Sequence, residues 1–264
     1  MMKFLKGFLI TVQFFTIIPL PCELPMDDQH LKRAVQAFPL LGLFQGALYS
    51  SFLYMLLYHS PFSHLAAAFL LWLAIILLTG GIHLDGWMDA SDAYFSYRDR
   101  KKRLEIMKDP RVGAFGVLSI LIFLSSRFFF IDELTVHPPL GLYVLIAAIP
   151  FLSKSVMGAL LVTVNPAKEE GLGYLFQKAT TPNSLWMYPL YWIIFLMLVC
   201  YVHMVSIFSL GILFIAAIVC FIFCRYKAVE WFGGITGDVL GASVEGTELC
   251  LWMALWLLHY FVMG

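Results

Sequence analysis

The stretch that decides the fold is Gly80–Gly116, which reads GGIHLDGWMDASDAYFSYRDRKKRLEIMKDPRVGAFG. The portion from residue 85 to residue 111 holds 13 of the chain's 34 charged residues. By contrast, no Asp, Glu, Lys or Arg occurs between residues 34 and 84. An uncharged run that leads directly into a charge-dense block is expected where a chain leaves a lipid bilayer and enters water. The sequence therefore places the chemistry of this protein at a membrane surface.

Three aspartates in this stretch predict a binding site for a divalent metal ion. Asp85, Asp89 and Asp92 stand at positions i, i+4 and i+7, which form one stripe on a helix of 3.6 residues per turn. Like charges on one helix face repel each other unless a cation lies among them. Mg²⁺ prefers oxygen ligands and commonly binds substrate phosphates at the same time. The alternative is a solvated polar face that pairs with the basic residues that follow.

The composition indicates an integral membrane protein. Of the 264 residues, 61% are hydrophobic and 13% are charged, whereas about 25% are charged in an average soluble domain. The net charge is zero, which argues against nucleic acid as a partner. Five cysteines form an odd number and lie mostly in apolar segments, as is typical of small core residues rather than of a disulfide or metal framework.

Seven apolar segments are long enough to cross a bilayer, which takes about 17–25 residues. They are 38–58, 65–82, 112–131, 140–162, 185–204, 207–224 and 248–263. We therefore predict an all-α integral membrane protein, a polytopic bundle of about seven transmembrane helices that forms a single domain over residues 1–264. Residues 4–18 are predicted as an interfacial or re-entrant helix, with a short span left open.

The distribution of Lys and Arg predicts the orientation. If the seven segments cross alternately, 15 of the 17 Lys and Arg residues fall on one side, and positive residues favour the cytoplasmic side. We therefore expect the charged block and the segments 163–184 and 225–247 to face the cytoplasm from the cell (inner or plasma) membrane. Of the two remaining cations, Arg127 is expected to extend to the outer interface. Lys154 is expected to face the bundle interior and a partner, either a stripe carboxylate or a substrate phosphate.

A second cluster of functional residue types lies at 232–245, FGGITGDVLGASVE. Asp238 and Glu245 are seven residues apart and would share a helix face. The glycines at 233, 234 and 237 would let a ligand phosphate approach the backbone, although glycines in membrane proteins also serve close helix packing. We predict that this segment packs beside residues 85–92, so that Asp238 shares the metal ion.

These two stretches carry a resemblance to a known family. Gly80–Gly116 resembles the signature region of the cobalamin synthase (adenosylcobinamide-GDP ribazoletransferase) family, and GGITGDVLGASVE is similar to its C-terminal motif. The segments AFPLLGLFQG (37–46) and NPAKEEGLGYLF (165–176) match weaker family features. The resemblance therefore covers nearly the whole chain.

The resemblance implies a Mg²⁺-dependent phosphoryl transfer late in cobalamin (vitamin B12) biosynthesis. Alpha-ribazole, or its 5′-phosphate, would displace GMP from adenosylcobinamide-GDP at the cytoplasmic membrane face. The expected metal ligands are Asp85, Asp89, Asp92, Asp238 and Glu245, and the expected phosphate-binding residues are Arg98, Lys108, Asp109, Arg111, Lys154, Gly233, Gly234 and Gly237. The general base stays open among Asp92, Asp238 and His83. The number of metal ions and the formation of a homo-oligomer also stay open.

Two other classes of function compete with this interpretation. A membrane phosphotransferase of the CDP-alcohol type uses a similar set of aspartates, but its Ala-Arg-containing pattern is absent because Trp-Met-Asp follows Asp85-Gly86. An ion-coupled transporter would use Asp85, Asp92 and Lys154. Transporters favour binding sites at the midplane and internal repeats, whereas the carboxylates here gather at one interface and the two halves of the sequence show no repeat.

Overall fold

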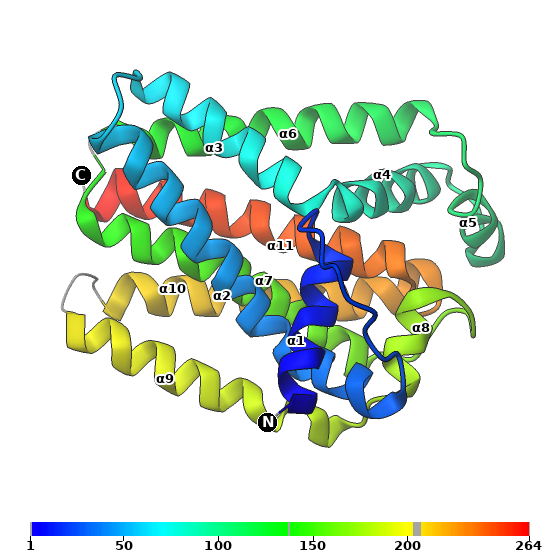
Figure 1. Ribbon diagram of the computed structural model, residues 1–264. Helices are drawn as coiled ribbons and strands as arrows, with labels where there is room; N and C mark the ends of the chain where they lie inside the picture. Colours follow the sequence, from blue (N-terminus) through cyan, green and yellow to red (C-terminus); the bar gives the residue numbers. More distant parts are fainter. Residues whose placement is uncertain (1, 137, 203–206, 264) are drawn as a thin grey trace.

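The computed structural model describes residues 2–136, 138–202 and 207–263, and these residues form a bundle of helices (Figure 1). The described residues contain no β-strand, and a single isolated bridge joins Pro166 to Ile235. The predicted class, an all-α polytopic membrane protein, is confirmed. The predicted break between the apolar segments 185–204 and 207–224, near residues 203–206, lies outside the described residues.

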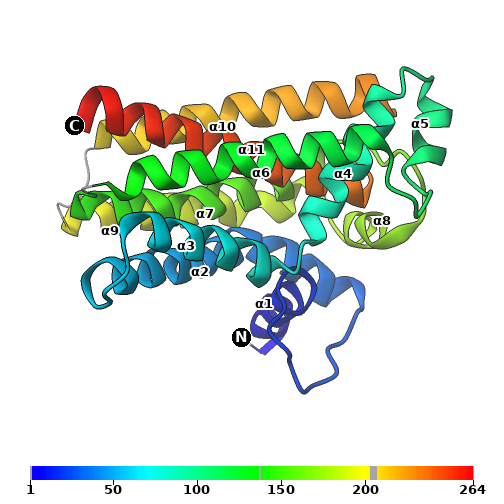
Figure 2. The same cartoon turned by 90° about the horizontal axis from the view of Figure 1, so that it is seen from above.

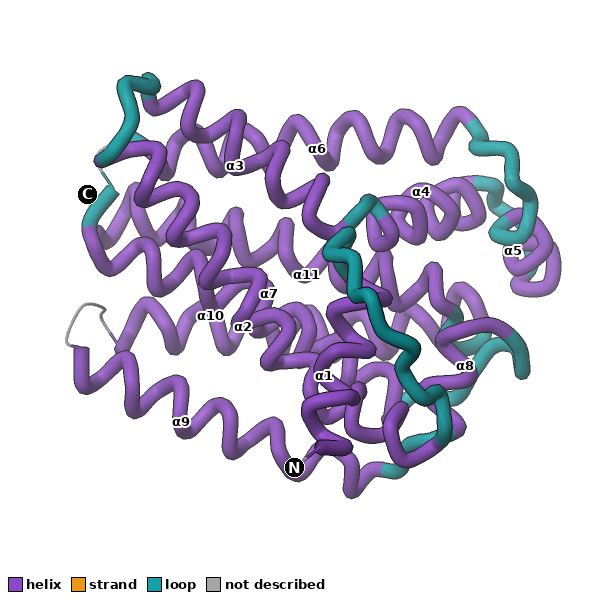
Figure 3. Tube along the Cα trace, in the orientation of Figure 1, coloured by secondary structure: helices purple, strands orange, loops and turns teal. Residues whose placement is uncertain are grey.

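Long helices run alternately between the two ends of the bundle, with their connecting loops gathered at those ends (Figures 1 and 3). These helices are α2 (Asp28–Tyr58), α3 (His64–Thr79), α6 (Ala114–Thr135), α7 (Leu140–Thr163), α9 (Met187–Val202), α10 (Ile207–Lys227) and α11 (Gly237–Leu258). The shorter helices are α1 (Met2–Phe15), α4 (Ile82–Phe95), α5 (Arg100–Ile106) and α8 (Gly171–Lys178), with single turns η1 (Pro182–Trp186), η2 (Ala228–Phe232) and η3 (His259–Met263).

Most of the predicted spans coincide with these helices. Five helical segments are long and apolar enough to cross a membrane, and a sixth qualifies if α3 and α4 are taken as one bent span. The segment predicted at 248–263 is not among these candidates, and its predicted start was wrong. Residues 248–258 belong to α11, which begins at Gly237 and carries the acidic residues Asp238, Glu245 and Glu248. Helix α1 is also not among them. It packs against α2.

A sharp bend separates α3 from α4. The two helix axes differ by 86° across the break at Gly80 and Gly81. Both glycines adopt left-handed backbone conformations, with φ of 62° and 74°, which residues with a Cβ rarely adopt. The bend turns α4 across the end of the bundle at which α5 and α8 also lie (Figure 2). The aspartate stripe is therefore on a helix that crosses the end of the bundle nearly at right angles to α3.

The orientation can be tested by cysteine labelling of a variant that lacks the five native cysteines. Cysteines at positions 97 and 170 are expected to react with an impermeant maleimide only from the cytoplasmic side, and those at positions 62 and 136 only from the outer side. All four positions are exposed, so the reagent can reach them. Position 226 is a further cytoplasmic probe, because Tyr226 is exposed. The nearby position 228 is unsuitable, because Ala228 is buried. Labelling of 97 and 170 from opposite sides would contradict the alternating arrangement.

Candidate active site

The glycine-rich segment before α11 fixes the position of Asp238. Ile235 donates its backbone N–H to the carbonyl of Asn165 at 2.9 Å and accepts from the N–H of Ala167 at 2.9 Å. Gly234 has a φ of 153°, and a Cβ there would lie 2.4 Å from the carbonyl oxygen of Asn165. The missing side chain at Gly234 therefore makes room for the backbone of residues 165–167. The sequence had suggested that it makes room for a ligand.

The start of α11 follows from this pairing. The Thr236 side chain caps the helix by accepting the Val239 N–H at 3.1 Å. Asp238 consequently lies in the first turn, where the helix dipole favours a negative charge. Gly237 beside it is exposed, with no atom within 4 Å of an added Cβ. Gly237 is thus the one of the three predicted glycines that borders open space where a phosphate could approach. Gly233 ends η2 with a φ of 80°.

The second motif packs directly against the first, as the sequence predicts. A Cβ on Gly86 would lie 2.7 Å from the carbonyl oxygen of Asp238, and one on Gly241 would lie 3.3 Å from the Cα of His83. Only helices with glycine at these positions can approach so closely. The contact brings Asp238 to the aspartate stripe across about 150 residues of sequence.

The carboxylates of this cluster repel one another. Asp89 is half-buried in α4, and its pKa is raised to about 6 by burial and by the negative charges of Asp85, Asp238 and Asp92. Among the described residues, none of the four carboxylates forms an ion pair with a Lys or Arg. The alternative in which the stripe pairs with the following basic run is therefore not what the structure shows.

Asp92 contacts the start of α6. Its carboxylate accepts the backbone N–H of Gly116 at 3.3 Å. A Cβ on Gly113, which stands at the start of α6, would lie 2.1 Å from the same carboxylate. Asp92 thus binds the positive end of a helix that has no side-chain cap of its own, and it holds the end of the charged loop in place.

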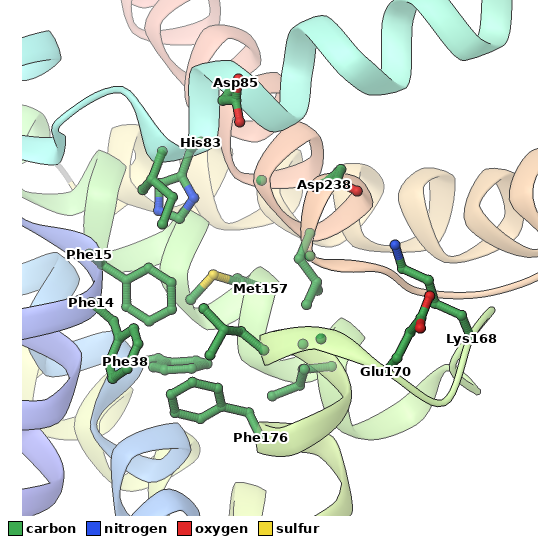
Figure 4. A pocket seen from close by; sticks show the side chains of 18 residues that line it. Phe14, Phe15, Phe38, His83, Asp85, Met157, Lys168, Glu170, Phe176 and Asp238 are labelled. Carbon is green, nitrogen blue, oxygen red and sulfur yellow. The ribbon is translucent and has the colours of Figure 1, made fainter. Parts of the chain in front are cut away.

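Asp85 and Asp238 face a cavity of about 270 Å³ at this end of the bundle (Figure 4). Its rim is charged, because Lys168 and Glu170 complete it beside the two aspartates. Its deeper part is apolar and aromatic, with residues from α1, α2, α7 and α8: Phe14, Phe15, Phe38, Met157, Leu161 and Phe176. The cavity is thus amphipathic, with carboxylates at its mouth.

His83 lies between these two parts. It is buried, and its imidazole stacks on the ring of Phe15 with centroids 5.5 Å apart and planes inclined by 19°. Its Nε2 atom is buried without a hydrogen-bond partner, although His83 lines the cavity.

No group of three or more His, Cys, Asp or Glu side chains in the part of the chain that the structure describes is arranged to hold a metal ion. Asp85 and Asp238 fit a different arrangement, in which a hard cation takes one or two carboxylates and completes its shell with water and substrate phosphates. Neither carboxylate forms an ion pair among the described residues, and their negative charge beside a cavity is the feature that fits such an ion.

The predicted phosphate-binding residues of the charged block do not themselves line the cavity, and they differ in what they contact. Lys108 pairs with Glu170, which lines the cavity, so Lys108 lies near its mouth. Arg111 binds Asp109 at 2.6 Å, and this pairing lowers the pKa of Asp109 to about 2. Arg98 is exposed just before α5.

Two predicted site residues belong to a separate ionic cluster within the bundle. Glu245 pairs with Arg127, and the Lys154 ammonium lies 3.3 Å from the carboxylate of Glu248. Arg127 also lies 3.9 Å from Glu248, which accepts a hydrogen bond from Ser153 at 2.8 Å. Lys154 faces the interior, as expected, but its partner is Glu248 and not the stripe or a phosphate. The structure pairs Glu245 with Arg127, where a metal ion was expected.

Arg127 corrects another expectation. Its side chain is 1% exposed, so it does not extend to the outer interface. The guanidinium instead lies over the ring of Phe123, 4.5 Å from its centroid. A buried guanidinium in a bilayer-spanning helix needs a buried carboxylate, and Glu245 supplies it.

Sequence reasoning missed several residues of the cavity. Lys168 is the main one, and its positive charge acts on the carboxylate of Asp238. It belongs to NPAKEEGLGYLF, and that segment was singled out only by resemblance. The aromatic residues of the floor come from three separate segments, α1, α2 and α8, and no local pattern marks them.

Comparison with known proteins identifies the relatives of this chain. The family described as cobalamin-5-phosphate synthase matches residues 7–256. A protein of Geobacillus sp. (strain WCH70) named adenosylcobinamide-GDP ribazoletransferase is 41% identical, over 98% of each chain. Proteins with the same name from Geobacillus kaustophilus and Treponema denticola are 42% and 35% identical, over 98% and 94% of this chain and 98% and 96% of their own. No solved structure matches.

Proposed function

Because the chain belongs to the cobalamin-5-phosphate synthase family, we propose that it transfers the adenosylcobinamide phosphate group of adenosylcobinamide-GDP to alpha-ribazole or to its 5′-phosphate and releases GMP. The protein is a transferase of cobalamin biosynthesis, and we propose these molecules as its donor and acceptor. The observation that carries it is the meeting of Asp85 and Asp238, one from each family motif, at the mouth of one cavity.

The reaction is a displacement at phosphorus. A sugar hydroxyl of the acceptor, free in both alpha-ribazole and its 5′-phosphate, forms a bond to the phosphorus that carries the cobinamide, while the bridging P–O bond to GMP breaks. The proton of this hydroxyl passes to a base, and GMP leaves with the bonding electron pair. Such transfers depend mainly on positioning and on neutralising charge.

Asp85 and Asp238 would hold Mg²⁺ together with the diphosphate of the donor, and Asp89 would add negative charge behind them. The ion would supply positive charge to the diphosphate and to the leaving phosphate. This arrangement needs only two protein ligands.

The chain's own cations stand around the same mouth. Lys168 lines it, and Lys108 lies beside it through Glu170. Their ammonium groups would bind the phosphates of the donor. Of the three candidate bases, Asp238 and His83 line the cavity, whereas Asp92 is engaged with α6.

The position of the site supports a reaction at the cytoplasmic face of the cell membrane. Residues of α8 line the cavity, and α8 lies at the same end of the bundle as α5 (Figures 1 and 2). The same end carries nearly all the Lys and Arg residues, which favours the cytoplasmic side.

The proposal is tested with purified protein in detergent or nanodiscs. GMP release from adenosylcobinamide-GDP is expected to require both alpha-ribazole (or its 5′-phosphate) and Mg²⁺, and a stoichiometric corrinoid product is expected to form. Removal of Mg²⁺ with a chelator should abolish release, and its return should restore it. Folded protein that releases no GMP with either acceptor would contradict the proposed function. Phosphotransfer from a CDP-alcohol in the absence of adenosylcobinamide-GDP would favour a phosphotransferase of the CDP-alcohol type.

A further inference from the structure

The cavity beside Asp85 and Asp238 has a floor built for a flat apolar ring. The rings of Phe15 and Phe38 meet edge to face with centroids 5.5 Å apart, and Phe176 lies 6.1 Å from Phe38. Phe14 lies 5.9 Å from Phe176, also edge to face. Figure 4 shows these rings gathered below His83. Aromatic walls of this kind bind planar apolar groups through stacked and edge-to-face contacts.

The size of the cavity limits what it can receive. Its volume is about 270 Å³, and pockets for whole drug-sized molecules are about 300–1,000 Å³. A corrinoid macrocycle with its side chains is larger than this. A bicyclic base with part of its sugar is of the right order.

His83 provides a specific polar contact within this apolar floor. Its Nε2 atom is buried and has no partner among the described residues. A buried polar atom of this kind is normally hydrogen-bonded, and one that lacks a protein partner is explained by a ligand or a water. The ring of His83 is held in place by its stacking on Phe15, so its nitrogen would meet a ligand in a fixed direction.

We propose that this pocket receives the base of the acceptor nucleoside, an apolar bicyclic benzimidazole whose unsubstituted ring nitrogen accepts a hydrogen bond from the imidazole of His83. This inference rests on the proposed function. With the base on the aromatic floor, the sugar extends toward the rim, and its reacting hydroxyl points to Asp85 and Asp238. His83 is then a binding residue, and the base that takes the proton is a carboxylate.

The guanine base of the donor fits less well. Guanine, on the donor, presents an amide N–H, an amino group and two acceptor atoms at its edges. Met157, Leu161 and the phenylalanines offer no partners for these groups. Burial of unpaired polar edges is costly, so the aromatic floor favours the apolar benzimidazole of the acceptor over the guanine of the donor.

The experiment measures acceptor and donor separately. Phe15→Leu and His83→Leu are each expected to raise the KM for alpha-ribazole about tenfold, the equivalent of one lost contact, while the KM for adenosylcobinamide-GDP stays unchanged. His83→Gln, whose amide can still donate, should recover most of the loss. Phe129→Leu, an exposed aromatic on α6 outside the cavity, is the matched control and should change neither value.

A second measurement does not depend on turnover. Alpha-ribazole alone, without donor or Mg²⁺, is expected to raise the Tm of the wild-type protein through preferential binding to the folded state. The shift should vanish in Phe15→Leu and His83→Leu. Adenosine, whose base has polar edges, should give a smaller shift than alpha-ribazole.

The outcomes separate this inference from the proposed function. If GMP release requires alpha-ribazole but the two variants raise the donor KM instead, the pocket holds the donor and the inference is wrong. If His83→Leu lowers kcat and leaves the acceptor KM unchanged, His83 acts as the base and the inference is also wrong. If the wild type binds alpha-ribazole but never releases GMP, the proposed function fails and the pocket assignment stands.

Discussion

Asp85→Asn and Asp238→Asn are each expected to lower acceptor-dependent GMP release by about 100-fold or more, with the protein still folded and inserted in the membrane. An amide keeps the shape of the side chain but removes the charge that holds a hard cation. The loss of charge stabilisation in the transition state is several kcal/mol, and each 1.36 kcal/mol is about tenfold in rate. The measurement is the initial rate of GMP release at saturating substrates and Mg²⁺.

The same variants have a readout without turnover. Mg²⁺ is expected to raise the Tm of the wild-type protein, because the ion binds the folded arrangement of Asp85 and Asp238 and relieves their repulsion. Each Asn variant should reduce that rise. Glu105→Gln, an exposed acid on α5, is the matched control. Near-normal turnover of both Asn variants at saturating Mg²⁺ would show that neither carboxylate holds the metal.

The structure also predicts a difference within the stripe. Asp92→Asn should reduce turnover less than Asp85→Asn, because an amide oxygen can still accept the N–H of Gly116 and maintain the start of α6. Equal losses in the two variants would instead indicate that Asp92 turns toward the metal ion during the reaction.

Arg127→Met is expected to destabilise the protein by about 3–5 kcal/mol, because breaking a buried ion pair leaves one charge without a partner. Arg127 and Glu245 have side chains that are 1% and 3% exposed, so neither water nor lipid headgroups can replace the missing partner. The measurement is thermal or denaturant unfolding in detergent. Arg225→Met, which removes an exposed guanidinium at the bundle end, should have little effect.

A double variant distinguishes the pair from general damage to the core. Arg127→Met combined with Glu245→Gln removes the unpaired charge and should recover part of the lost stability. The two effects should therefore not add, as expected for residues in contact. A double variant that is as unstable as the sum of the single variants would show that Glu245 does not depend on Arg127.

The sequence by itself determined the features that depend on local order along the chain. Apolar length marked most of the membrane helices, because each backbone polar group in lipid must be satisfied within its own helix. The spacing of Asp85, Asp89 and Asp92 predicted one helix face, since the helical period is fixed. The paired glycines at 80 and 81 likewise occupy the bend that turns this helix across the bundle end.

Only the tertiary structure decided which charges meet. The sequence offered Glu245 as a metal ligand and Lys154 as a partner of phosphate, and packing gave them Arg127 and Glu248 instead. It also turned Asp92 toward α6 and left Asp85 and Asp238 facing the cavity. Helical periodicity states which face of its own helix a residue occupies but not which helix lies opposite. The partner of a buried charge is therefore fixed only when the helices pack.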